Sequence, residues 1–379
     1  MHRYRRYPIY RTVFMSLCLL ISIVLTACDS SPSMGGAPAP AANGGKGCTK
    51  VGILLPETTS SVRWETNDHP ALVQAVKAAI PNVEIDYKNG QDNEITQISQ
   101  AEADLANGDC ILIVAPHDSV TAAAIVTKAK AQNVPVIAYD RLIQSKDLDY
   151  YVSFNNLRVG QLQGEYIAQH YQEYAKDGSI NLAIISGSQT DNNALLFSQG
   201  AHEALDPLLA NGTLKNIAET FTPDWTTTNA QAEMEAMLAE QQNNIQIAYV
   251  ANDGMASGVI TALKTVGLNG KVLVTGQDAT LAGIRAILAG QQNMTVYKPT
   301  TSEAQSTGAL VKALYSGAET TNLTHNQVTT TYDGAEIPSI LDAPISIDRG
   351  NIASTVLADH YLEKKDICAG FPAGTAGIC

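Results

Sequence analysis

Polar and aromatic side chains recur where the expected strands of this 379-residue chain end. The candidates for chemistry are Arg63, Trp64, Asp140, Arg141, Asn193, Trp225, Asn252, Asp253, Gln277, Asp278 and Lys298. An ionised Asp accepts hydrogen bonds from two neighbouring hydroxyls, an Arg fork donates to two, and an amide does one of each. The pattern therefore predicts a binding site for a ligand with several adjacent hydroxyl groups, as a sugar ring has.

The chain contains only two tryptophans, Trp64 and Trp225, and both fall in these polar loops. The C–H faces of a pyranose lie well against an indole, so the two rings could close on both faces of one sugar. Ordinary core packing is the alternative for either tryptophan. The adjacent pair Asp140-Arg141 could instead be a surface ion pair, and Lys298 could be an exposed turn residue.

Three of the acidic residues have a further structural alternative. Asp191, Asp253 and Asp278 each stand where a strand turns into a helix, so each could be a helix N-cap. A cap can also contact a ligand. The recurrence of polar residues at one end of the strands, rather than any single residue, carries the prediction.

The elements that must position these residues are short β-branched runs that alternate with longer amphipathic segments. Strands are expected at 51–55, 83–87, 111–115, 134–139, 182–186, 217–221, 245–251 and 272–275. Helices are expected at 70–79, 94–106, 120–132, 194–209, 230–241 and 256–266. The strands are almost wholly apolar, as parallel strands covered on both faces are. Two successive rounds of such units predict an α/β protein with two doubly wound, Rossmann-like lobes.

The remainder of the chain predicts connections between the lobes. Extended segments are expected at 295–297, 328–332 and 345–347, and helices at 303–315 and about 351–362. Crossings near 153–156, 293–298 and 330–344 would form a hinge of three strands. The predicted lobes are then residues 48–154 with 298–330, and residues 155–295 with 340–379.

Four cysteines fall in the predicted folded part, which favours disulfides in an oxidising compartment. Cys48 and Cys110 precede the first and third strands, which are neighbours in a doubly wound sheet, so a disulfide between them is plausible. Separate thiols are the alternative. Cys368 and Cys379 could close a small loop. No His accompanies these cysteines at ligand spacing, so we expect no metal.

Residues 1–27 have the pattern of a secretory signal, with four arginines, an apolar stretch at 13–24, and small residues before Cys28. Cys28 in this context resembles the lipobox of bacterial lipoproteins, which implies acylation of its sulfur and membrane attachment through lipid. An ordinary signal peptide is the alternative. Residues 28–47 are rich in Ser, Pro, Ala and Gly, and predict a flexible tether. We therefore expect an extracytoplasmic, lipid-anchored protein.

The formal net charge of −13 argues against nucleic acid and against a basic membrane-binding patch. Catalysis is also disfavoured. A glycosidase needs one carboxyl group with a raised pKa, whereas Asp140 adjoins Arg141 and the other acids stand at helix starts, which favour the ionised form. The usual hydrolase, zinc-protease and phosphate-loop motifs do not occur in the sequence. We expect a binding protein without a cofactor.

Several strings of the sequence resemble one family. They are Arg63-Trp64, Ala138-Tyr139-Asp140-Arg141, Asp191-Asn192-Asn193-Ala194, Gly276-Gln277-Asp278-Ala279 and Met294-Thr295-Val296-Tyr297-Lys298-Pro299. In this order they are similar to the type I periplasmic sugar-binding proteins of ABC importers, and most closely to the D-xylose and multiple-sugar branch. The resemblance implies a monomeric, two-lobed receptor that closes on one monosaccharide, with D-xylose first, and delivers it to an ABC permease.

The resemblance also implies how the candidates divide between the lobes. Arg63, Trp64, Asp140 and Arg141 would contact the sugar from the first lobe. The second lobe would supply Asn193, Trp225, Asn252, Asp253 and Gln277, with Asp278 and Lys298 close by. Glu65, Asn155 and residues 222–224 depart from the family pattern, which leaves glucose, arabinose and galactose open as ligands. A second hypothesis is that a chemoreceptor or membrane kinase, rather than a permease, reads the closed form.

Overall fold

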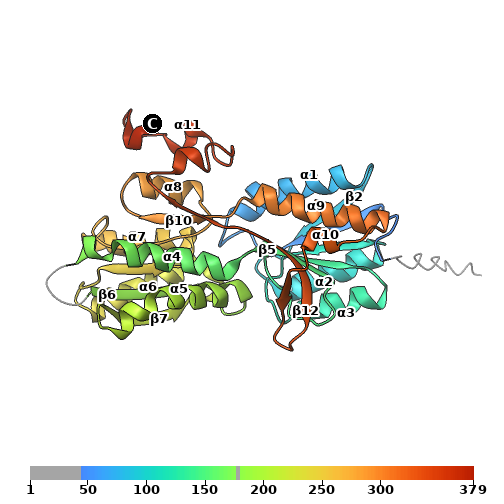
Figure 1. Cartoon of the computed structure of the whole chain (residues 1–379), viewed down its shortest axis with the longest axis horizontal. Coiled ribbons are helices and arrows are strands. Elements are labelled where there is room, and N and C mark those ends of the chain that lie inside the picture. The colour runs from blue at the N-terminus through green and yellow to red at the C-terminus, as the bar shows by residue number, and fades with distance from the viewer. Residues whose placement is uncertain (1–43, 176–179) are drawn as a thin grey trace, which may run out of the picture. The chain divides into compact units, whose positions relative to one another are not determined.

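Two mainly parallel sheets, one in each lobe, organise the computed structural model, which describes residues 44–175 and 180–379 (Figure 1). The described residues belong to one compact unit. The predicted signal peptide, the lipidation candidate Cys28 and most of the predicted tether lie outside the described residues.

The first sheet has seven strands, of which β11 and β12 form an antiparallel hairpin and all other neighbours pair in parallel. They are β1 (Lys50–Leu55), β2 (Glu84–Asn89), β3 (Ile111–Val114), β4 (Val136–Tyr139), β5 (Tyr150–Phe154), β11 (Val328–Thr330) and β12 (Glu336–Asp342). Their order is β11-β12-β5-β4-β3-β1-β2. Parallel β1 and β3 are neighbours, as predicted.

Helices cover both faces of this sheet, which is why its central strands are apolar throughout. One face packs against α1 (His69–Ala79) and α9 (Thr300–Ser316), and α10 (Thr321–Thr324) follows α9. The other face packs against α2 (Glu94–Ala106) and α3 (Ala123–Ala131).

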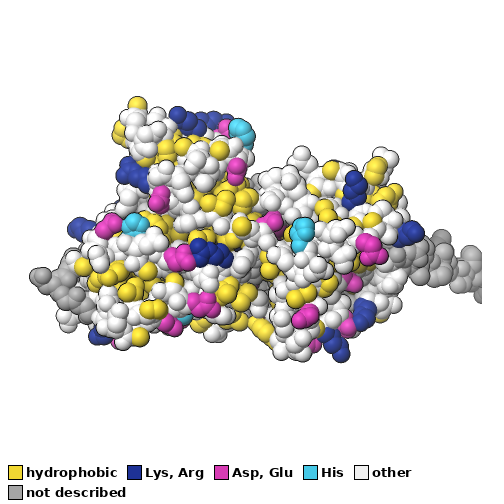
Figure 2. Space-filling view, in the orientation of Figure 1, with side chains coloured by type: hydrophobic (Ala, Val, Ile, Leu, Met, Phe, Trp, Pro, Cys, Tyr) yellow, Lys and Arg dark blue, Asp and Glu magenta, His cyan; other side chains and the backbone are white. Residues whose placement is uncertain are grey.

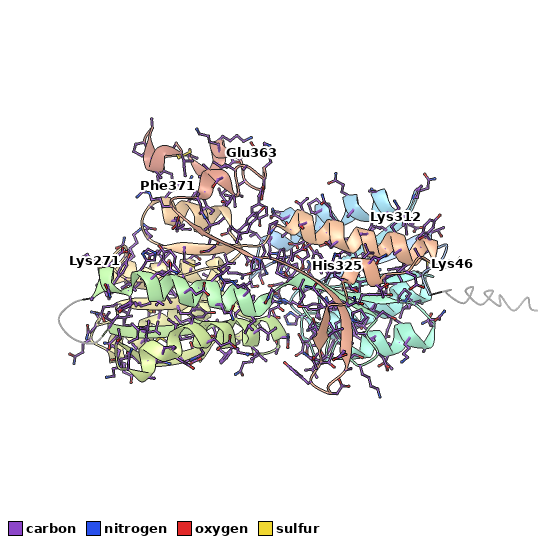
Figure 3. The ribbon with its side chains drawn as sticks, in the orientation of Figure 1. Lys46, Lys271, Lys312, His325, Glu363 and Phe371 are labelled. Atoms are coloured by element: carbon purple, nitrogen blue, oxygen red, sulfur yellow. A yellow bond between two sulfur atoms is a disulfide. The ribbon has the colours of Figure 1, made fainter. Side chains whose placement is uncertain are left out.

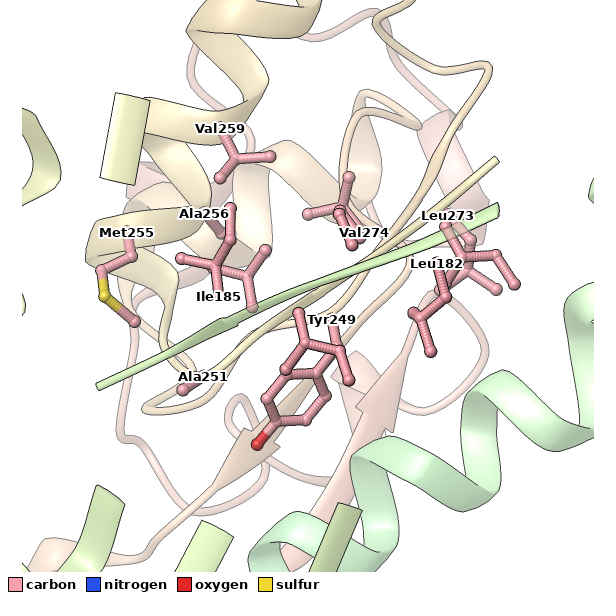
Figure 4. Close-up of a cluster of buried hydrophobic side chains, with 14 of the residues drawn as sticks. Leu182, Ile185, Tyr249, Ala251, Met255, Ala256, Val259, Leu273 and Val274 are labelled. Atoms are coloured by element: carbon pink, nitrogen blue, oxygen red, sulfur yellow. The ribbon is translucent and has the colours of Figure 1, made fainter. Parts of the chain in front are cut away.

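The second lobe repeats the design with a parallel sheet in the order β7-β6-β8-β9. Its strands are β6 (Ile180–Ser186), β7 (Leu214–Phe221), β8 (Ile247–Val250) and β9 (Leu273–Val274). Its helices are α4 (Asn156–His170), α5 (Asn192–Ala210), α6 (Thr227–Glu240), α7 (Asp253–Thr265) and α8 (Leu281–Leu288). The core between sheet and helices includes Ile185 of β6, Tyr249 of β8 and Val259 of α7 (Figure 4). The two doubly wound lobes of the prediction are confirmed.

Three connections join the lobes. Two antiparallel strands, β10 (Met294–Tyr297) and β13 (Ile345–Asp348), lie next to them, and β10 is attached to the second sheet by a hydrogen bond from the Val296 amide to the Gly276 carbonyl. The chain crosses after β5, after β10 and after β12. The Asn155 amide donates to the Asp342 carbonyl at 2.9 Å, so the first and third crossings lie side by side.

The third crossing is shorter than the predicted one at 330–344. Residues Glu336–Asp342 form β12 and pair in parallel with β5 in the first sheet. The first lobe therefore extends to Asp342, and the predicted boundaries at 330 and 340 differ from the sheet topology. Strand β12 was not predicted, because Pro338 and the acidic residues at its two ends, Glu336 and Asp342, interrupt the apolar pattern of a strand.

The predicted helix at 351–362 is wrong. The chain forms a short 3-10 turn (Ile352–Ser354) and then a series of turns, with Thr355 at φ −121° and His360 at φ 54°. The Thr355 hydroxyl donates to the Asn351 carbonyl, which is one way a side chain competes with helical pairing. Ile352 and Val356 are nonetheless buried against α8, so the apolar spacing reflects packing rather than helix.

Two disulfides are present, between Cys48 and Cys110 and between Cys368 and Cys379. The first ties the residue before β1 to the residue before β3. The second closes the C-terminal segment, which contains α11 (Lys364–Ile367) and in which Figure 3 labels Phe371. Phe371 and Ile367 pack against the buried face of α8.

Removal of the Cys48–Cys110 disulfide should cost more stability than removal of the Cys368–Cys379 disulfide. The first spans 62 residues of sequence and the second 11, so the first restricts the unfolded chain more. We expect the free energy of unfolding to fall by about 4 kcal/mol for C48S/C110S and by about 3 kcal/mol for C368S/C379S. Urea unfolding of both variants measures this, and a larger loss for the C-terminal pair would contradict it.

Candidate functional site

The carboxyl ends of the strands in both lobes face one cavity. It has an empty volume of about 320 Å³, part of which is open to solvent. Its lining residues are Ser60, Ser61, Arg63, Trp64, Asp140, Arg141, Asp191, Asn193, Phe197, Trp225, Asn252, Gln277, Asp278 and Lys298. Every residue predicted for the site is among them except Asp253.

The cavity lies where doubly wound sheets place ligands, outside the carboxyl ends of the strands. Three of its residues, Asp140 after β4, Trp225 after β7 and Asp278 after β9, have φ values of 58°, 55° and 97°. Residues other than glycine rarely adopt such backbone conformations, and they keep them only where the surrounding structure fixes them. The turns that aim these side chains into the cavity are therefore held by their surroundings.

Arg63 links the first lobe to the second through its guanidinium group. Nε and Nη2 donate to the two oxygens of Asp68 at 2.8 and 2.7 Å, which fixes the plane of the fork. Nη1 lies 3.0 Å from an oxygen of Asp140 in the same lobe and 3.5 Å from an oxygen of Asp278 in the other. On its outer side, Nη2 lies 3.5 Å from Glu303 of α9.

Arg141 and Lys298 make similar bridges. The Nε of Arg141 lies 2.9 Å from Asp191 in the second lobe, and its Nη2 lies 3.2 Å from Glu57 in the first. The ammonium group of Lys298, at the second crossing, lies 3.2 Å from Asp140 and 3.6 Å from Asp278. The cavity wall thus contains three cationic and three anionic side chains, all nearly buried.

This pairing sets the protonation of the buried groups. Burial would raise the pKa of Asp140, but Arg63 and Lys298 outweigh it and hold that pKa well below its ordinary value. Burial likewise would lower the pKa of Arg63, and the carboxylates of Asp140 and Asp68 keep it above its usual value. Burial and the nearby Asp140 carboxylate raise the pKa of Glu303 well above its ordinary value. Asp140 is therefore ionised at neutral pH.

Both tryptophans line the cavity, as the proposal of two indoles on one ring requires. Trp64 donates from Nε1 to Glu57 at 3.2 Å, and the guanidinium carbon of Arg63 lies 4.6 Å from its ring centroid. Trp225 packs edge-on against Phe197, with the ring centroids 6.2 Å apart. Whether the indoles sandwich a sugar ring stays a prediction.

Several polar atoms at the cavity make no hydrogen bond within the described part of the chain. They are Ser61 Oγ, Trp225 Nε1, Gln277 Oε1 and Asp278 Oδ1, although the last forms the ion pairs named above. Buried polar atoms normally have partners, so a cluster of such atoms on one cavity is a sign of a polar ligand.

Asp253, which was predicted to contact the ligand, is not among the residues that line the cavity. Its carboxylate lies beneath the cavity wall, where one oxygen accepts from Gln292 Nε2 and Thr295 Oγ1 at 2.7 and 2.9 Å. The other accepts from the Thr280 amide and hydroxyl at 2.8 and 3.1 Å. Asn252, its neighbour, lines the cavity and also caps α7 through the Met255 amide. Asn252 and Asp253 are therefore adjacent in the sequence but differ in position: Asn252 lines the cavity, and Asp253 supports its wall from beneath.

Some residues of the site were not among the predicted ligand contacts. Phe197 stands one helical turn after Asn193 on α5, and this spacing could have identified it. Asp191 caps α5, as its alternative interpretation held, and it also lines the cavity. Ser60 and Ser61 precede Arg63 in a loop without regular pattern, and no sequence signal distinguishes them.

Two departures from the family pattern lie away from the cavity. Glu65 accepts a hydrogen bond from the Asn89 side chain at 2.8 Å and faces β2. Asn155 caps α4 by accepting from the Arg158 amide. Neither residue lines the cavity, so neither substitution changes its wall directly.

Two lobes that close around a polar cavity at their strand ends define a class of ligand-binding receptor. In agreement with this, residues 51–319 match the family described as periplasmic binding protein domain. The chain is 34% identical to the D-xylose-binding periplasmic protein of Haemophilus influenzae, over 84% of this chain and 92% of that protein. It is also 34% identical to a multiple sugar-binding periplasmic receptor of Rhizobium radiobacter, over 86% and 93% respectively.

A solved structure supports the same assignment. An ABC transporter solute-binding protein from Clostridium phytofermentans, with bound β-D-glucose, is 30% identical and superposes with a TM-score of 0.75. The alignment covers 84% of this chain and 99% of that one. The chain therefore belongs to the periplasmic binding protein family, in its type I sugar-binding branch.

The predictions of fold class and of a binding protein rather than an enzyme are confirmed by these relatives, which are solute-binding proteins. Among residues 44–175 and 180–379, no helix has the length and apolar character needed to cross a bilayer. On the face that Figure 2 shows, Lys and Arg side chains are scattered among Asp and Glu side chains.

Gly187→Ala should weaken ligand binding by displacing Trp225. A Cβ at Gly187 would lie only 2.1 to 2.3 Å from three atoms of the indole ring. Overpacking of about 1–3 kcal/mol corresponds to an increase in Kd of about 5- to 150-fold. Calorimetry measures Kd, and Gly350→Ala is the control, because a Cβ there meets only the Asp348 side chain. An unchanged Kd in Gly187→Ala would show that the position of Trp225 is unimportant.

Asp253→Asn should change the pH dependence of stability. Burial raises the pKa of Asp253 to about 7 from an unfolded value near 3.8. Between these values the folded protein holds a proton that the unfolded chain has lost, so this carboxyl group makes the free energy of unfolding fall as pH rises from about 4 to 7. The slope is at most about 1.4 kcal/mol per pH unit.

The asparagine variant lacks this proton. The stability of the wild type relative to the variant should therefore decline from pH 4 to 7 and stay constant above about pH 8. Urea unfolding at several pH values tests it, and parallel curves for the two proteins would contradict the assignment.

Proposed function

We propose that this protein is a lipid-anchored, extracytoplasmic receptor that binds one monosaccharide between its lobes and delivers it to an ABC importer. D-xylose is the first candidate ligand. Glucose, arabinose and galactose are the alternatives. The proposal combines the cavity of the described residues with the signal and lipobox pattern around Cys28.

The composition of the cavity wall carries the proposal. The cations Arg63, Arg141 and Lys298 are each already paired with carboxylates of the protein, so a neutral ligand can enter without disturbing these pairs. A sugar acid or an amino sugar would add an unpaired charge to a buried site, which is costly. Hydroxyl groups, which both donate and accept, suit the unpaired atoms of Ser61 and Gln277.

The relatives support the same ligand class, because their names refer to D-xylose, to multiple sugars and to bound glucose. Since the D-xylose and multiple-sugar relatives are equally similar, the ligand must be measured.

Hinge closure provides the mechanism. Contacts of Arg141 with Asp191, and of Asn193 with the carbonyl and carboxylate of Asp140, join the lobes around the cavity. A sugar that touches both lobes binds the closed form better than the open one and shifts the population toward it. A missing or misplaced hydroxyl leaves a buried partner unpaired at about 1–3 kcal/mol, which is how epimers would be rejected.

A thermal-shift screen of the purified protein tests the ligand class. The panel holds D-xylose, D-glucose, L-arabinose, D-galactose, glucuronate and glucosamine, the last two as charged controls. We expect Tm to rise with at least one neutral aldose, more for a tighter-binding sugar at the same concentration, and to stay constant with the charged sugars. A protein that responds to no monosaccharide, or only to charged ones, would refute the proposal.

Arg141→Ala should abolish tight sugar binding while the lobes still fold. The change removes the Arg141 contacts to Glu57 and Asp191, and buried groups left unpaired cost about 3–5 kcal/mol, or about 150- to 5,000-fold in Kd. The matched control is Arg158→Ala, because Arg158 pairs only with residues of its own helix, such as Glu165, at the surface. Calorimetry on both variants decides, and equal affinities would remove Arg141 from the site.

A further inference from the structure

A second set of contacts joins the lobes outside the cavity. The loop before α3 in the first lobe meets the loop before α5 in the second. The Ser119 amide donates to the Thr190 carbonyl at 2.9 Å, and the Ser119 hydroxyl accepts from the Asn192 amide at 3.2 Å. The side chain of Gln144 donates to the Asn192 side chain at 3.0 Å. None of these four residues lines the cavity.

The first lobe holds its half of this contact ready. The Gln144 amide donates to the Ser119 carbonyl at 2.7 Å, so the two residues support each other. The side-chain carbonyl of Gln144 accepts from the Tyr332 amide, in the β11–β12 hairpin, at 2.8 Å. These bonds lie within the first lobe and leave the Gln144 amino group directed at the second. Pre-positioned donors lose little entropy when a partner arrives.

The second lobe contributes the N-terminal end of a helix. Asn192 begins α5, and the first amides of a helix lack partners within it. Asp191 accepts from the Asn193 amide, whereas the Asn192 amide finds its acceptor on Ser119 of the other lobe. Ser119 is only 2% exposed and Asn192 only 8%, so the contact is closed to water. In separated lobes water would serve both groups.

We propose that Ser119 and Gln144 form a clasp that stabilises the closed form and raises the affinity for every bound sugar by the same factor, without touching the sugar. The proposal rests on the sugar-dependent closure proposed above. Observed affinity is the intrinsic affinity of the closed form scaled by the fraction of protein that can close. A contact made only on closure changes that fraction and therefore shifts all ligands together.

The test compares Ser119→Ala and Gln144→Ala with the wild type by calorimetry on two sugars that the thermal-shift screen has identified as ligands. Loss of one net hydrogen bond should raise Kd by about 2- to 12-fold in each variant, and the ratio of the two Kd values should stay at its wild-type value. Stopped-flow fluorescence should locate the change in the dissociation rate. The Tm without sugar should be unchanged, since the clasp is absent from the open form.

Ser99→Ala is the matched control, because the Ser99 hydroxyl bonds only within its own helix, to the Ile95 carbonyl. A wild type that binds no sugar would refute the proposed function rather than the clasp. If the wild type binds, unchanged Kd values in both variants would overturn the clasp. A change in the ratio of the two Kd values, or a lower Tm without sugar, would also overturn it, since it would assign these residues to sugar recognition or to lobe folding. Gln144→Ala keeps the test available if Ser119→Ala fails to fold.

Discussion

The pairing of buried charges across two lobes is the constraint on which the site depends. Arg63, Asp140, Asp278 and Lys298 are all nearly buried, and burial of an ion without a partner is costly. Arg63 and Asp140 pair within the first lobe, whereas Asp278, from the second lobe, finds its cationic partners only in Arg63 of the first lobe and Lys298 at the second crossing. Asp68 accepts from Nε and Nη2 of Arg63, which leaves Nη1 directed toward Asp140 and Asp278. The closed arrangement is therefore an electrostatic unit that requires both lobes.

The fold supplies this unit by a general property of parallel sheets. All strands of a doubly wound sheet point their carboxyl ends toward the same edge, and the turns that follow carry the polar side chains. At Asp140, Trp225 and Asp278 the turn is tight enough to require a left-handed backbone at a residue other than glycine. Such strain persists only where the surrounding structure fixes it. Below the Asp278 turn, the buried hydrogen bonds that Asp253 accepts from Thr280 and Thr295 provide this support.

Sequence patterns predicted the parts of this protein that depend on periodicity. The two lobes and nearly all of the site follow from apolar strands, and from Arg63, Asn193 and Lys298 at strand or helix ends. Sequence patterns did not predict features that depend on the direction in which a side chain points. Asp253 and Asn252 are adjacent and equally polar, and only the twist of the first turn of α7 sends one into the lobe. The spacing of Ile352 and Val356 fits a helix, yet both residues lie in turns. The Thr355 hydroxyl donates to the Asn351 carbonyl, which in a helix would accept a backbone amide.

The central claim is that a monosaccharide enters the space between the two lobes and changes the surroundings of both indoles. Intrinsic fluorescence measures this directly, because Trp64 and Trp225 are the only tryptophans in the chain and both line the cavity. Titration with D-xylose, followed by the other neutral aldoses, should give a saturable change in emission. Trp64→Phe and Trp225→Phe should each retain a part of it, reported by the remaining indole. A folded protein whose emission stays constant with every monosaccharide, or whose response comes from one tryptophan alone, would contradict the account.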